Sequence, residues 1–454
     1  MSNKTKIQIL LISYYFAPGN LMGAVRPTKL AKYFNREGYK VNVISSKDNK
    51  WLFLNNEIKI DQTLLTDSID LNIYRPSQSW LFKFFAYIVK SIMNIFISSQ
   101  KKTSTNLGSN IKKSPLGFKH YFIKNAMFFM ALLQDIDFTI CAILSKKVRK
   151  LAKESTHIIS SYGPYSSHFL AYALKSIYGN KISWIADFRD PIAQPTDSKI
   201  QFNINKKIEN KICHKANHIV SVSNGYLQSI VNNKFLDKTT VITNGYDIED
   251  LNCIHENNII NEKFIISYTG TTYGGRRDLK PLFNVIKELE IESSINIDML
   301  EFHYAGPESE LVNQLGSRFG IDNKIKIFGN ITRNESIRLN NNSNLIVVAT
   351  WNDKFHLGVL PGKFFESLLF KKPLLILVSG EIGESEIVDI TNQFKLGVTY
   401  EEAKKDVEYI RLKEFIKSKL LLFNNSPKSD TTNTEKFEYQ YIARKYLELI
   451  NKEA

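Results

Sequence analysis

The sequence predicts an α/β protein with two Rossmann-like, doubly wound parallel-sheet domains that face a central cleft. Short apolar segments alternate with stretches of helical periodicity along most of the 454 residues, which is the pattern of parallel strands joined by crossover helices. The alternation runs in two series, separated by the polar stretch Asp247–Glu262. A chain of this length holds two or three domains, each with its own core.

The first repeating unit lies at the start of the chain. The apolar run Lys6–Ser13 is too short for a secretory signal and indicates a buried strand. A turn-rich stretch with Pro18 and Gly23 follows, and Pro27 fits the start of a helix, where its missing N–H costs no hydrogen bond. Further strands are expected at Val41–Ser45, His157–Ser161, Ser183–Asp187, His218–Ser223, Thr240–Thr243, Phe264–Thr269, Glu301–Ala305, Lys324–Phe328, Leu345–Ala349 and Leu374–Val378.

These elements divide the chain into three parts. We expect an N-terminal Rossmann-like domain over residues 1–247 and a C-terminal one over residues 248–430. Residues 431–454 form a final helix, because Tyr439, Ile442, Tyr446, Leu449 and Ile450 recur at helical spacing. We expect this helix to pack back towards the N-terminal domain.

One region interrupts the alternation. From Trp80 to Ile97 the chain is almost wholly apolar and aromatic, and Lys83, Lys90 and Asn94 would share one helix face. Three interpretations stay open: an interfacial amphipathic helix, a core or interdomain helix, and a spanning helix, although a span needs about 20 apolar residues. Lysines around the segment suit anionic lipid headgroups. We therefore expect an insertion at about residues 77–136, with a possible membrane-surface helix.

The composition excludes several classes of protein. Hydrophobic residues make up 43% and charged residues 23% of the chain, so general disorder, collagen-like repeats and disulfide mini-domains are excluded. Three scattered cysteines show no zinc or redox spacing and fit a reducing compartment. The net charge of +15 suits phosphorylated ligands, anionic membranes or nucleic acid, or it reflects a Lys-, Asn- and Ile-rich composition with no function behind it. Because no recognition helix or RNA-binding motif accompanies that charge, we expect no nucleic-acid partner.

The sharpest motif lies in the second series and reads Gly358-Val-Leu-Pro-Gly-Lys363-Phe-Phe-Glu366. A Gly/Pro turn leads into a helix, whose first amides, together with Lys363, suit a phosphate group. Glu366 follows one turn later and could accept hydrogen bonds from a vicinal diol such as a ribose. A capped helix with a solvated Lys–Glu pair is the alternative.

A second motif, Thr269–Asp278, follows the strand expected at Phe264–Thr269 and combines three glycines with Arg276 and Arg277. The loop leaves the carboxyl end of a strand, where open α/β sheets bind their ligands. The paired arginines could hold a diphosphate or form salt bridges with Asp278.

Four segments together resemble the family 4 retaining glycosyltransferases of the GT-B fold, especially bacterial members that build surface polysaccharides. In chain order they are LLISYYFAPGNLMGAVRPTKLAKYF, SSYGPYSSH with WIADFRDP, VITNGYD, and YTGTTYGGRRD with GVLPGKFFESLLFKKPLL. The resemblance covers nearly the whole chain outside the insertion. It implies a metal-independent, hexosyltransferase-like enzyme without a cofactor that moves a sugar from a nucleoside-diphosphate sugar to an acceptor hydroxyl. The implied acceptor is a lipid-linked glycan in capsule, O-antigen or exopolysaccharide synthesis, and the implied location is cytoplasmic, peripheral at the inner membrane surface.

The resemblance also implies residue roles. The donor-binding residues would be Gly23, Arg276, Arg277, Gly362, Lys363 and Glu366, with the basic ones at the diphosphate and Glu366 at the ribose. Arg189 and Asp190 would be catalytic and face the cleft from the N-terminal domain, and Arg26 and His168 would lie on the acceptor side. For His168, a partly buried helix histidine is the alternative.

The sequence departs from the family at one position. Many members carry two glutamates separated by seven residues; Glu366 matches the second, and the first falls at Gly358. Asp353 or His356 would replace it only with a rearranged loop.

Two other functions stay open: a GT-B-fold nucleotide-sugar epimerase and a non-catalytic basic membrane-binding protein. We expect no metal site, because the Asp135-Ile-Asp137 motif has apolar neighbours typical of a packed helix and the pair His214 and His218 lacks a zinc-protease glutamate.

Overall fold

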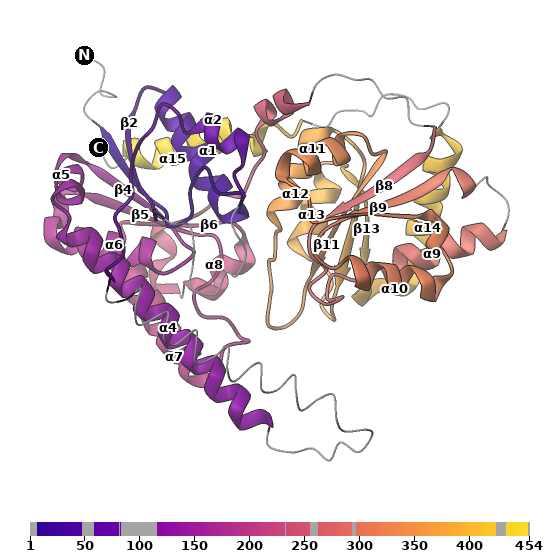
Figure 1. Cartoon of the computed structure of the whole chain (residues 1–454), viewed down its shortest axis with the longest axis horizontal. Coiled ribbons are helices and arrows are strands. Elements are labelled where there is room, and N and C mark those ends of the chain that lie inside the picture. The colour runs from indigo at the N-terminus through magenta and orange to yellow at the C-terminus, as the bar shows by residue number, and fades with distance from the viewer. Residues whose placement is uncertain are drawn as a thin grey trace.

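The computed structural model describes residues 7–47, 59–80, 82, 116–231, 233–254, 262–292, 297–423 and 433–452. Two sheets, each with helices on both faces, form two lobes (Figure 1). Every pairing between the named strands is parallel. This confirms the predicted architecture of two doubly wound parallel-sheet domains.

The first lobe contains a seven-stranded sheet in the order β3-β2-β1-β4-β5-β6-β7. Successive residues of a strand point to opposite faces, so Ile9 and Leu11 of β1 pack against α1 and α15, whereas Leu10 and Ile12 pack beneath α4, α5 and α6. The strands are β1 (Gln8–Ile12), β2 (Lys40–Ile44), β3 (Asn72–Tyr74), β4 (His157–Ser161), β5 (Ser183–Phe188), β6 (His218–Ser221) and β7 (Thr239–Val241). The helices are α1 (Met22–Arg36), α2 (Gln62–Asp67), α4 (Leu116–Leu144), α5 (Lys146–Glu154), α6 (Ser166–Tyr178), α7 (Lys199–Lys215), α8 (Asn224–Ile230) and α15 (Tyr439–Lys452).

The second lobe contains a six-stranded sheet in the order β10-β9-β8-β11-β12-β13. Leu375 and Leu377 of β12 face α9, α10 and α14, whereas Leu374 and Ile376 face α11, α12 and α13. The strands are β8 (Phe264–Thr269), β9 (Leu300–Ala305), β10 (Ile325–Gly329), β11 (Leu345–Trp351), β12 (Leu374–Ser379) and β13 (Gly397–Glu401). The helices are α9 (Lys280–Glu292), α10 (Ser309–Phe319), α11 (Arg333–Asn341), α12 (Gly362–Ser367), α13 (Glu386–Gln393) and α14 (Lys405–Leu421).

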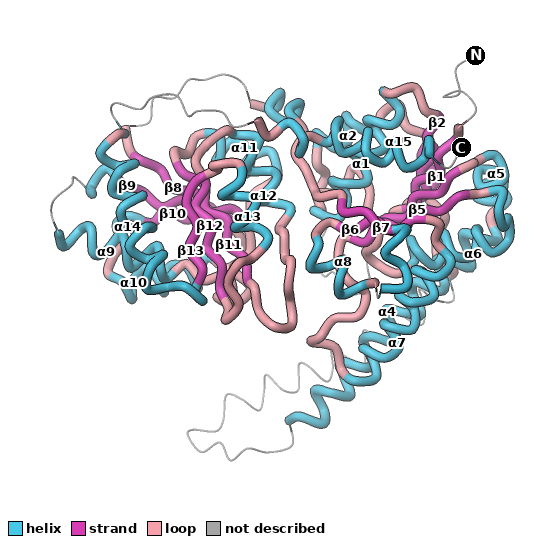
Figure 2. The backbone as a smooth tube through the Cα atoms, turned by 180° about the vertical axis from the view of Figure 1, so that it is seen from behind, coloured by secondary structure: helices cyan, strands magenta, loops and turns pink. Residues whose placement is uncertain are grey.

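The C-terminal helix returns to the first lobe. In α15, Tyr446 packs against Phe34 of α1 with ring centroids 6.1 Å apart, and the view from behind shows α15 beside α1 and α2 (Figure 2). The chain reaches this helix through the short turn Glu435–Phe437, whose Phe437 lies in the core of the second lobe. The last segment therefore ties the two lobes together.

The insertion region contains the long helix α4, which extends beyond the first lobe with α7 beside it (Figure 1). Side-chain bonds join the two helices, since Ser198 Oγ donates to Asn125 Oδ1 at 2.7 Å. Residues 83–97 of the expected membrane-surface helix lie outside the described residues.

Candidate functional site

A cavity of about 680 Å³ lies between the two lobes. It is lined at the carboxyl ends of several strands, with Arg189 and Asp190 after β5 in one wall and Gly270 after β8 in the other. A second cavity of about 210 Å³ shares Arg333 and Lys363 with it and continues along the ends of β8, β9 and β10. Open α/β sheets bind ligands in this crevice, so the joined cavities are the candidate site.

The predicted pair Lys363 and Glu366 lies in this cavity, and Arg333 joins it. Lys363 Nζ lies 2.7 Å from Glu366 Oε2, and Arg333 Nε donates to Glu366 Oε1 at 2.9 Å. Burial alone would raise the pKa of Glu366, but the two cations lower it to about 2. The carboxylate therefore stays ionised and can accept further hydrogen bonds from a ligand.

Arg333 was not among the predicted residues. It is the first residue of α11, and Thr332 caps that helix in a capping box with Glu335. This Thr-Arg-Asn-Glu pattern just after an expected strand can be recognised in the sequence, so it was the signal that could have located Arg333 at the edge of the cleft.

The structure separates the two adjacent arginines. Arg277 lines the cavity, and its Nε is buried without a hydrogen-bond partner among the described residues. Its guanidinium lies over the Tyr273 ring, 4.7 Å from the centroid. Arg276 is outside the cavity wall and donates to Asp353 Oδ2 at 2.6 Å while it stacks on Trp351 at 4.2 Å. Arg277 is thus better placed than Arg276 for the predicted diphosphate role, which stays a prediction for both arginines.

The glycine-containing loop after β8 does not offer its amides to a ligand. The Glu308 carboxylate accepts hydrogen bonds from Thr272 N, from Gly274 N at 2.7 Å and from Thr271 Oγ1 at 2.6 Å. Burial would raise the pKa of Glu308, and these donors lower it to about 2. The Glu308 carboxylate therefore accepts hydrogen bonds from amides that a glycine-containing loop could otherwise donate to a phosphate.

The opposite wall belongs to the first lobe. Arg189 donates from Nη1 to Gly23 O at 2.7 Å and from Nε to Tyr162 O at 2.7 Å, so it fixes the start of α1 against the loop after β4. A Cβ on Gly23 would lie 3.1 Å from the Tyr15 ring and 3.3 Å from Arg189. Only a glycine therefore fits this close approach without displacing its neighbours.

Asp190 is the one carboxylate of this wall. Its side chain is exposed to the cavity and forms no hydrogen bond with any residue that the structure describes. The protein around the cavity desolvates the carboxylate and raises its pKa to about 6, against a smaller opposing effect of Arg189. Such a group can accept a proton near neutral pH.

Arg26 lines the cavity with its stem, but its charged end is fully engaged in the fold. Its Nε donates to Asp187 Oδ2 at 3.1 Å, and Nη2 donates to Ile242 O and Tyr446 Oη, both at 2.8 Å. The side chain is buried. The acceptor-side role predicted for Arg26 is corrected: this guanidinium holds β5, the end of β7 and α15 together.

His168 lies in the core of the first lobe and not in the cavity wall. Its Nδ1 lies 2.7 Å from Ser160 Oγ, and its ring packs 4.7 Å from Phe188. Burial lowers its pKa to about 3, so the ring is neutral in the folded protein. The acceptor-side prediction for His168 is therefore also corrected, and the core-histidine alternative holds.

Gly358 stands at a contact between the lobes. A Cβ at this position would lie 2.6 Å from Gly225 Cα of α8, so a glutamate cannot fit here in this arrangement. Asp353 and His356 do not replace it, because they pair with each other at 2.9 Å and with Arg276, outside the cavity wall. The first carboxylate of the family pattern thus has no counterpart among the described residues that line the cavity on this side.

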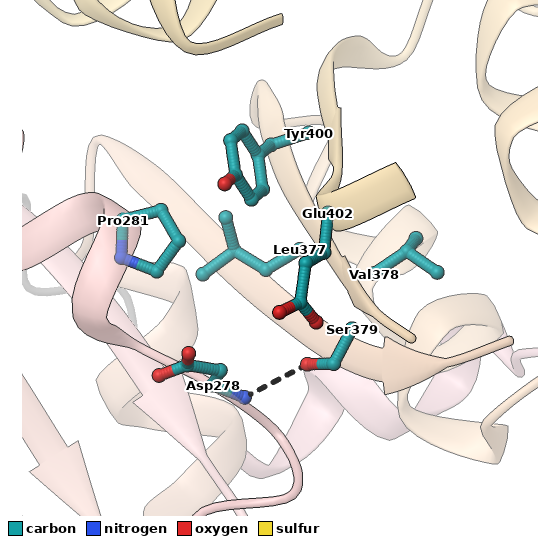
Figure 3. A pocket seen from close by; sticks show the side chains of 7 residues that line it. All are labelled: Asp278, Pro281, Leu377, Val378, Ser379, Tyr400 and Glu402. Atoms are coloured by element: carbon teal, nitrogen blue, oxygen red, sulfur yellow. Dashed lines mark hydrogen bonds between the residues drawn. The ribbon is translucent and has the colours of Figure 1, made fainter. Parts of the chain in front are cut away.

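Two further features resemble ligand sites but are not. Among the described residues, Asp67, Asp247 and Asp250 lie close enough to share a cation, but the ammonium of Lys29 lies 2.5–2.7 Å from all three carboxylates. This cluster is an ion-pair network. A small pocket of about 30 Å³ lies at the ends of β12 and β13, where Asp278 N donates to Ser379 Oγ at 3.2 Å (Figure 3). It has room for about two water molecules and is too small for a nucleotide.

Solved structures share this fold. Sucrose-phosphate synthase from Thermosynechococcus elongatus matches with a TM-score of 0.60 and 13% identity, over 98% of this chain and 98% of that chain. The lipopolysaccharide outer core galactosyltransferase WaaB matches with a TM-score of 0.57 and 11% identity, over 99% of this chain and 100% of that chain. A Listeria monocytogenes protein described as a UDP-N-acetylglucosamine 2-epimerase matches with a TM-score of 0.53 and 10% identity, over 99% and 96% of the two chains.

These similarities establish the GT-B fold, in which two parallel-sheet α/β domains face a cleft. No protein-family model matches the sequence, and no curated protein matches it by sequence.

Proposed function

We propose that the chain is a retaining glycosyltransferase that moves a sugar from a nucleoside-diphosphate sugar to an acceptor hydroxyl. One observation carries most of the support. Arg277, Lys363 and Arg333 converge with the ionised Glu366 at the carboxyl ends of the second sheet, inside the cavity between the lobes. Clustered cations beside one accepting carboxylate suit a ligand that has both a diphosphate and a diol.

The donor would lie along the second lobe. Its diphosphate would contact Arg277 and Lys363, and its ribose hydroxyls would donate to Glu366. The nucleoside base would enter the smaller cavity beside Asn330 and Thr332, which line it at the end of β10. This placement leaves the sugar at the centre of the larger cavity, facing Asp190.

The chemical step is a substitution at the anomeric carbon. The bond from that carbon to the diphosphate oxygen breaks, and a bond to the acceptor oxygen forms on the same face, through an oxocarbenium-like state. Arg277 and Lys363 stabilise the charge that grows on the departing diphosphate, so side chains supply this electrostatic effect without the help of a metal. The acceptor proton passes to the departing phosphate, and closure of the lobes excludes water.

The proposed acceptor is a lipid-linked glycan of capsule, O-antigen or exopolysaccharide synthesis, used at the cytoplasmic face of the membrane. It would enter along the wall formed by Gly23, Arg189 and Asp190, which belongs to the lobe that carries α4.

The test is a transfer assay in which labelled nucleotide sugars are offered to the chain with and without a membrane extract. Label that appears in lipid-extractable glycan only with the extract supports the proposal. Lys363→Ala and Glu366→Gln should lower transfer at least about a hundredfold, because each removes a charge-assisted contact. Glu384→Gln, on the exposed surface, is the matched control.

An epimerase is the second candidate, since the Listeria protein shares the fold. It would convert the labelled donor into its epimer when no acceptor is present. Product without extract, and no labelled glycan with it, would favour the epimerase and contradict transfer.

A further inference from the structure

Helix α4 carries its apolar side chains on the outside. Phe129, Leu133, Ile136, Ile140 and Leu144 recur at intervals of three and four residues, so they lie on one face. All are exposed, with Leu133 at 47%, Ile140 at 51% and Leu144 at 69%. We call this face the apolar stripe.

The inner face of α4 combines buried apolar side chains, such as Phe138 and Ala142, with buried polar ones. The side chains of Asn125, Gln134, Asp135 and Thr139 are all buried against the first lobe. Gln134 Nε2 donates to Tyr14 Oη at 3.2 Å, and Asn125 bonds to Ser198 at the start of α7. A helix on a water-facing surface carries polar residues on its outer face, so the exposed apolar stripe of α4 points to a surface that a membrane or a partner covers.

The length and hydropathy of α4 suit a bilayer. Ile123–Leu144 is long and apolar enough to cross a membrane, with a mean hydropathy of 1.8 in its most apolar window. At 1.5 Å per residue it is about 33 Å long. However, its inner face is bonded to Tyr14, whose ring lies 5.3 Å from Phe138. Because one side is held by protein, the helix can lie in a membrane surface but not be surrounded by lipid.

Basic side chains next to the apolar stripe indicate that the membrane surface is anionic. Helix α5 begins two residues after Leu144 and packs on the lobe through Val148, Leu151 and Ala152. Its exposed charged side chains are Lys146, Lys147, Arg149, Lys150 and Lys153, with Glu154 as the acidic residue. Lys124 adds a positive charge near the other end of the stripe. Basic residues at both ends of an apolar face complement anionic headgroups.

We propose that the apolar stripe of α4, with the basic face of α5, docks the first lobe on an anionic lipid bilayer. The stripe enters the boundary between headgroups and acyl chains, and the α5 lysines contact the headgroups. This surface is made of residues other than Trp80–Ile97, for which the sequence suggested membrane contact. The inference does not rest on the proposed transfer reaction, since binding to a bilayer requires no donor.

The test is flotation of the full chain with vesicles of phosphatidylcholine, alone or mixed with phosphatidylglycerol. The parent chain should float with the anionic vesicles and less with the neutral ones, and added salt should weaken the binding. Leu133→Asp/Ile140→Asp should lower the bound fraction at least about tenfold, because the charges enter the apolar boundary. The matched control is Ile410→Asp on α14, since Ile410 is 64% exposed on the other lobe; it should bind as the parent does.

A second variant tests the basic face of α5 without changing the apolar stripe. Lys146→Glu/Lys150→Glu changes only exposed side chains and should also reduce binding to anionic vesicles. Circular dichroism and thermal unfolding check both variants.

Four results would overturn the proposal. The parent could fail to float with anionic vesicles, or the stripe variant could float equally well. Binding could be lost in Phe84→Ser/Phe85→Ser and kept in the stripe variant, which would assign the membrane contact to Trp80–Ile97. Light scattering could show a parent dimer that the stripe variant abolishes, without any flotation, which would make the stripe a contact between two copies.

Discussion

Arg276 and Arg277 are neighbours in the chain, but only Arg277 lines the cavity, where its Nη1 donates to Thr271 O at 3.2 Å. Arg276 is held by Asp353 and stacks on Trp351, whereas the buried Nε of Arg277 donates no hydrogen bond to the described residues. Both guanidiniums lie over the Trp351 ring, at 4.2 Å and 5.5 Å from its centroid, but only Arg276 is paired with Asp353. The sequence alone could identify the pair of arginines, but it could not show which of them lines the cavity.

The arginine pair provides its own control. Arg277→Lys should weaken nucleoside-diphosphate binding by about 2 kcal/mol, or about thirtyfold, because a lysine cannot reproduce the planar fork of donors. Arg276→Lys should change the affinity less than about threefold. Isothermal titration of both variants measures the difference, and equal losses would contradict the assignment of the diphosphate to Arg277.

Asp190 should give the transfer rate a pH dependence. Desolvation by the protein around the cavity raises its pKa to about 6, and we expect the ionised form to orient the acceptor hydroxyl. The rate should therefore increase as the pH rises through about 6 and level off above it. In Asp190→Asn this increase should be absent, whereas Asp389→Asn on the surface of α13 should keep it.

The same shift predicts an effect on stability. The folded pKa of Asp190 lies above the ordinary value of 3.8, so folding favours the protonated form. The parent should lose stability relative to Asp190→Asn as the pH rises from about 4 to 6. Urea unfolding at pH 4 and pH 8 checks this, and a constant difference would contradict the shift.

At the scale of elements, α8 of the first lobe meets the second lobe at its N-terminus. Asn224 N and Gly225 N donate to the Glu386 carboxylate of α13 at 3.0–3.3 Å. A Cβ on Gly225 would lie 2.6 Å from Gly358 Cα and Gly358 N. The two glycines thus allow backbone contact where the family pattern has a glutamate, and we infer that this contact serves closure.

Gly225→Ala should therefore hold the lobes apart. Its methyl group meets backbone atoms, which cannot move aside as a flexible side chain can. The radius of gyration from X-ray scattering should increase and transfer should fall at least about tenfold. Gly383→Ala is the control, because its Cβ would meet the flexible end of Lys404 at 3.0 Å. An unchanged radius and rate in Gly225→Ala would show that this contact does not limit closure.

The sequence could predict most of the elements but not all. Every strand expected from apolar runs is present within two residues of its expected bounds. The missed strands β3 and β13 are a three-residue strand and one that begins at an exposed glycine, so neither has the apolar run of a central strand. The glycine loop after β8 looked like a phosphate loop because Glu308, which occupies its amides, is 34 residues away from Gly274 in the chain.

At the scale of the whole molecule, buried charges connect the lobes. Arg333 of α11 donates to Glu366 in the site, to Asp250 after the lobe junction at 2.6 Å, and to Thr63 of the first lobe at 3.0 Å. Lys29 of α1 also contacts Asp250 at 2.5 Å. Periodicity shows which face of a helix is buried and not which distant charge it meets, so neither this network nor the internal role of Arg26 could be predicted from the sequence.

The C-terminal helix closes a second buried network. Tyr446 Oη donates to Asp187 Oδ1 at 2.8 Å and accepts from Arg26 Nη2 at 2.8 Å. Tyr446→Phe should lower the free energy of unfolding by about 1–3 kcal/mol, because it leaves buried charged groups short of a partner. Tyr441→Phe, on the exposed face of the same helix, should change it by less than about 0.5 kcal/mol. Equal denaturant midpoints for the two variants would refute this role of α15.

The proposed transfer requires that the cleft hold a nucleoside diphosphate against Arg277, Lys363 and Glu366. Isothermal titration of the full chain with UDP, GDP and ADP, and with their monophosphates, tests it most directly. At least one diphosphate should bind with one-to-one stoichiometry, more tightly than its monophosphate, and Glu366→Gln should weaken it about tenfold or more. No binding by any diphosphate, or equal affinity in parent and Glu366→Gln, would contradict the claim.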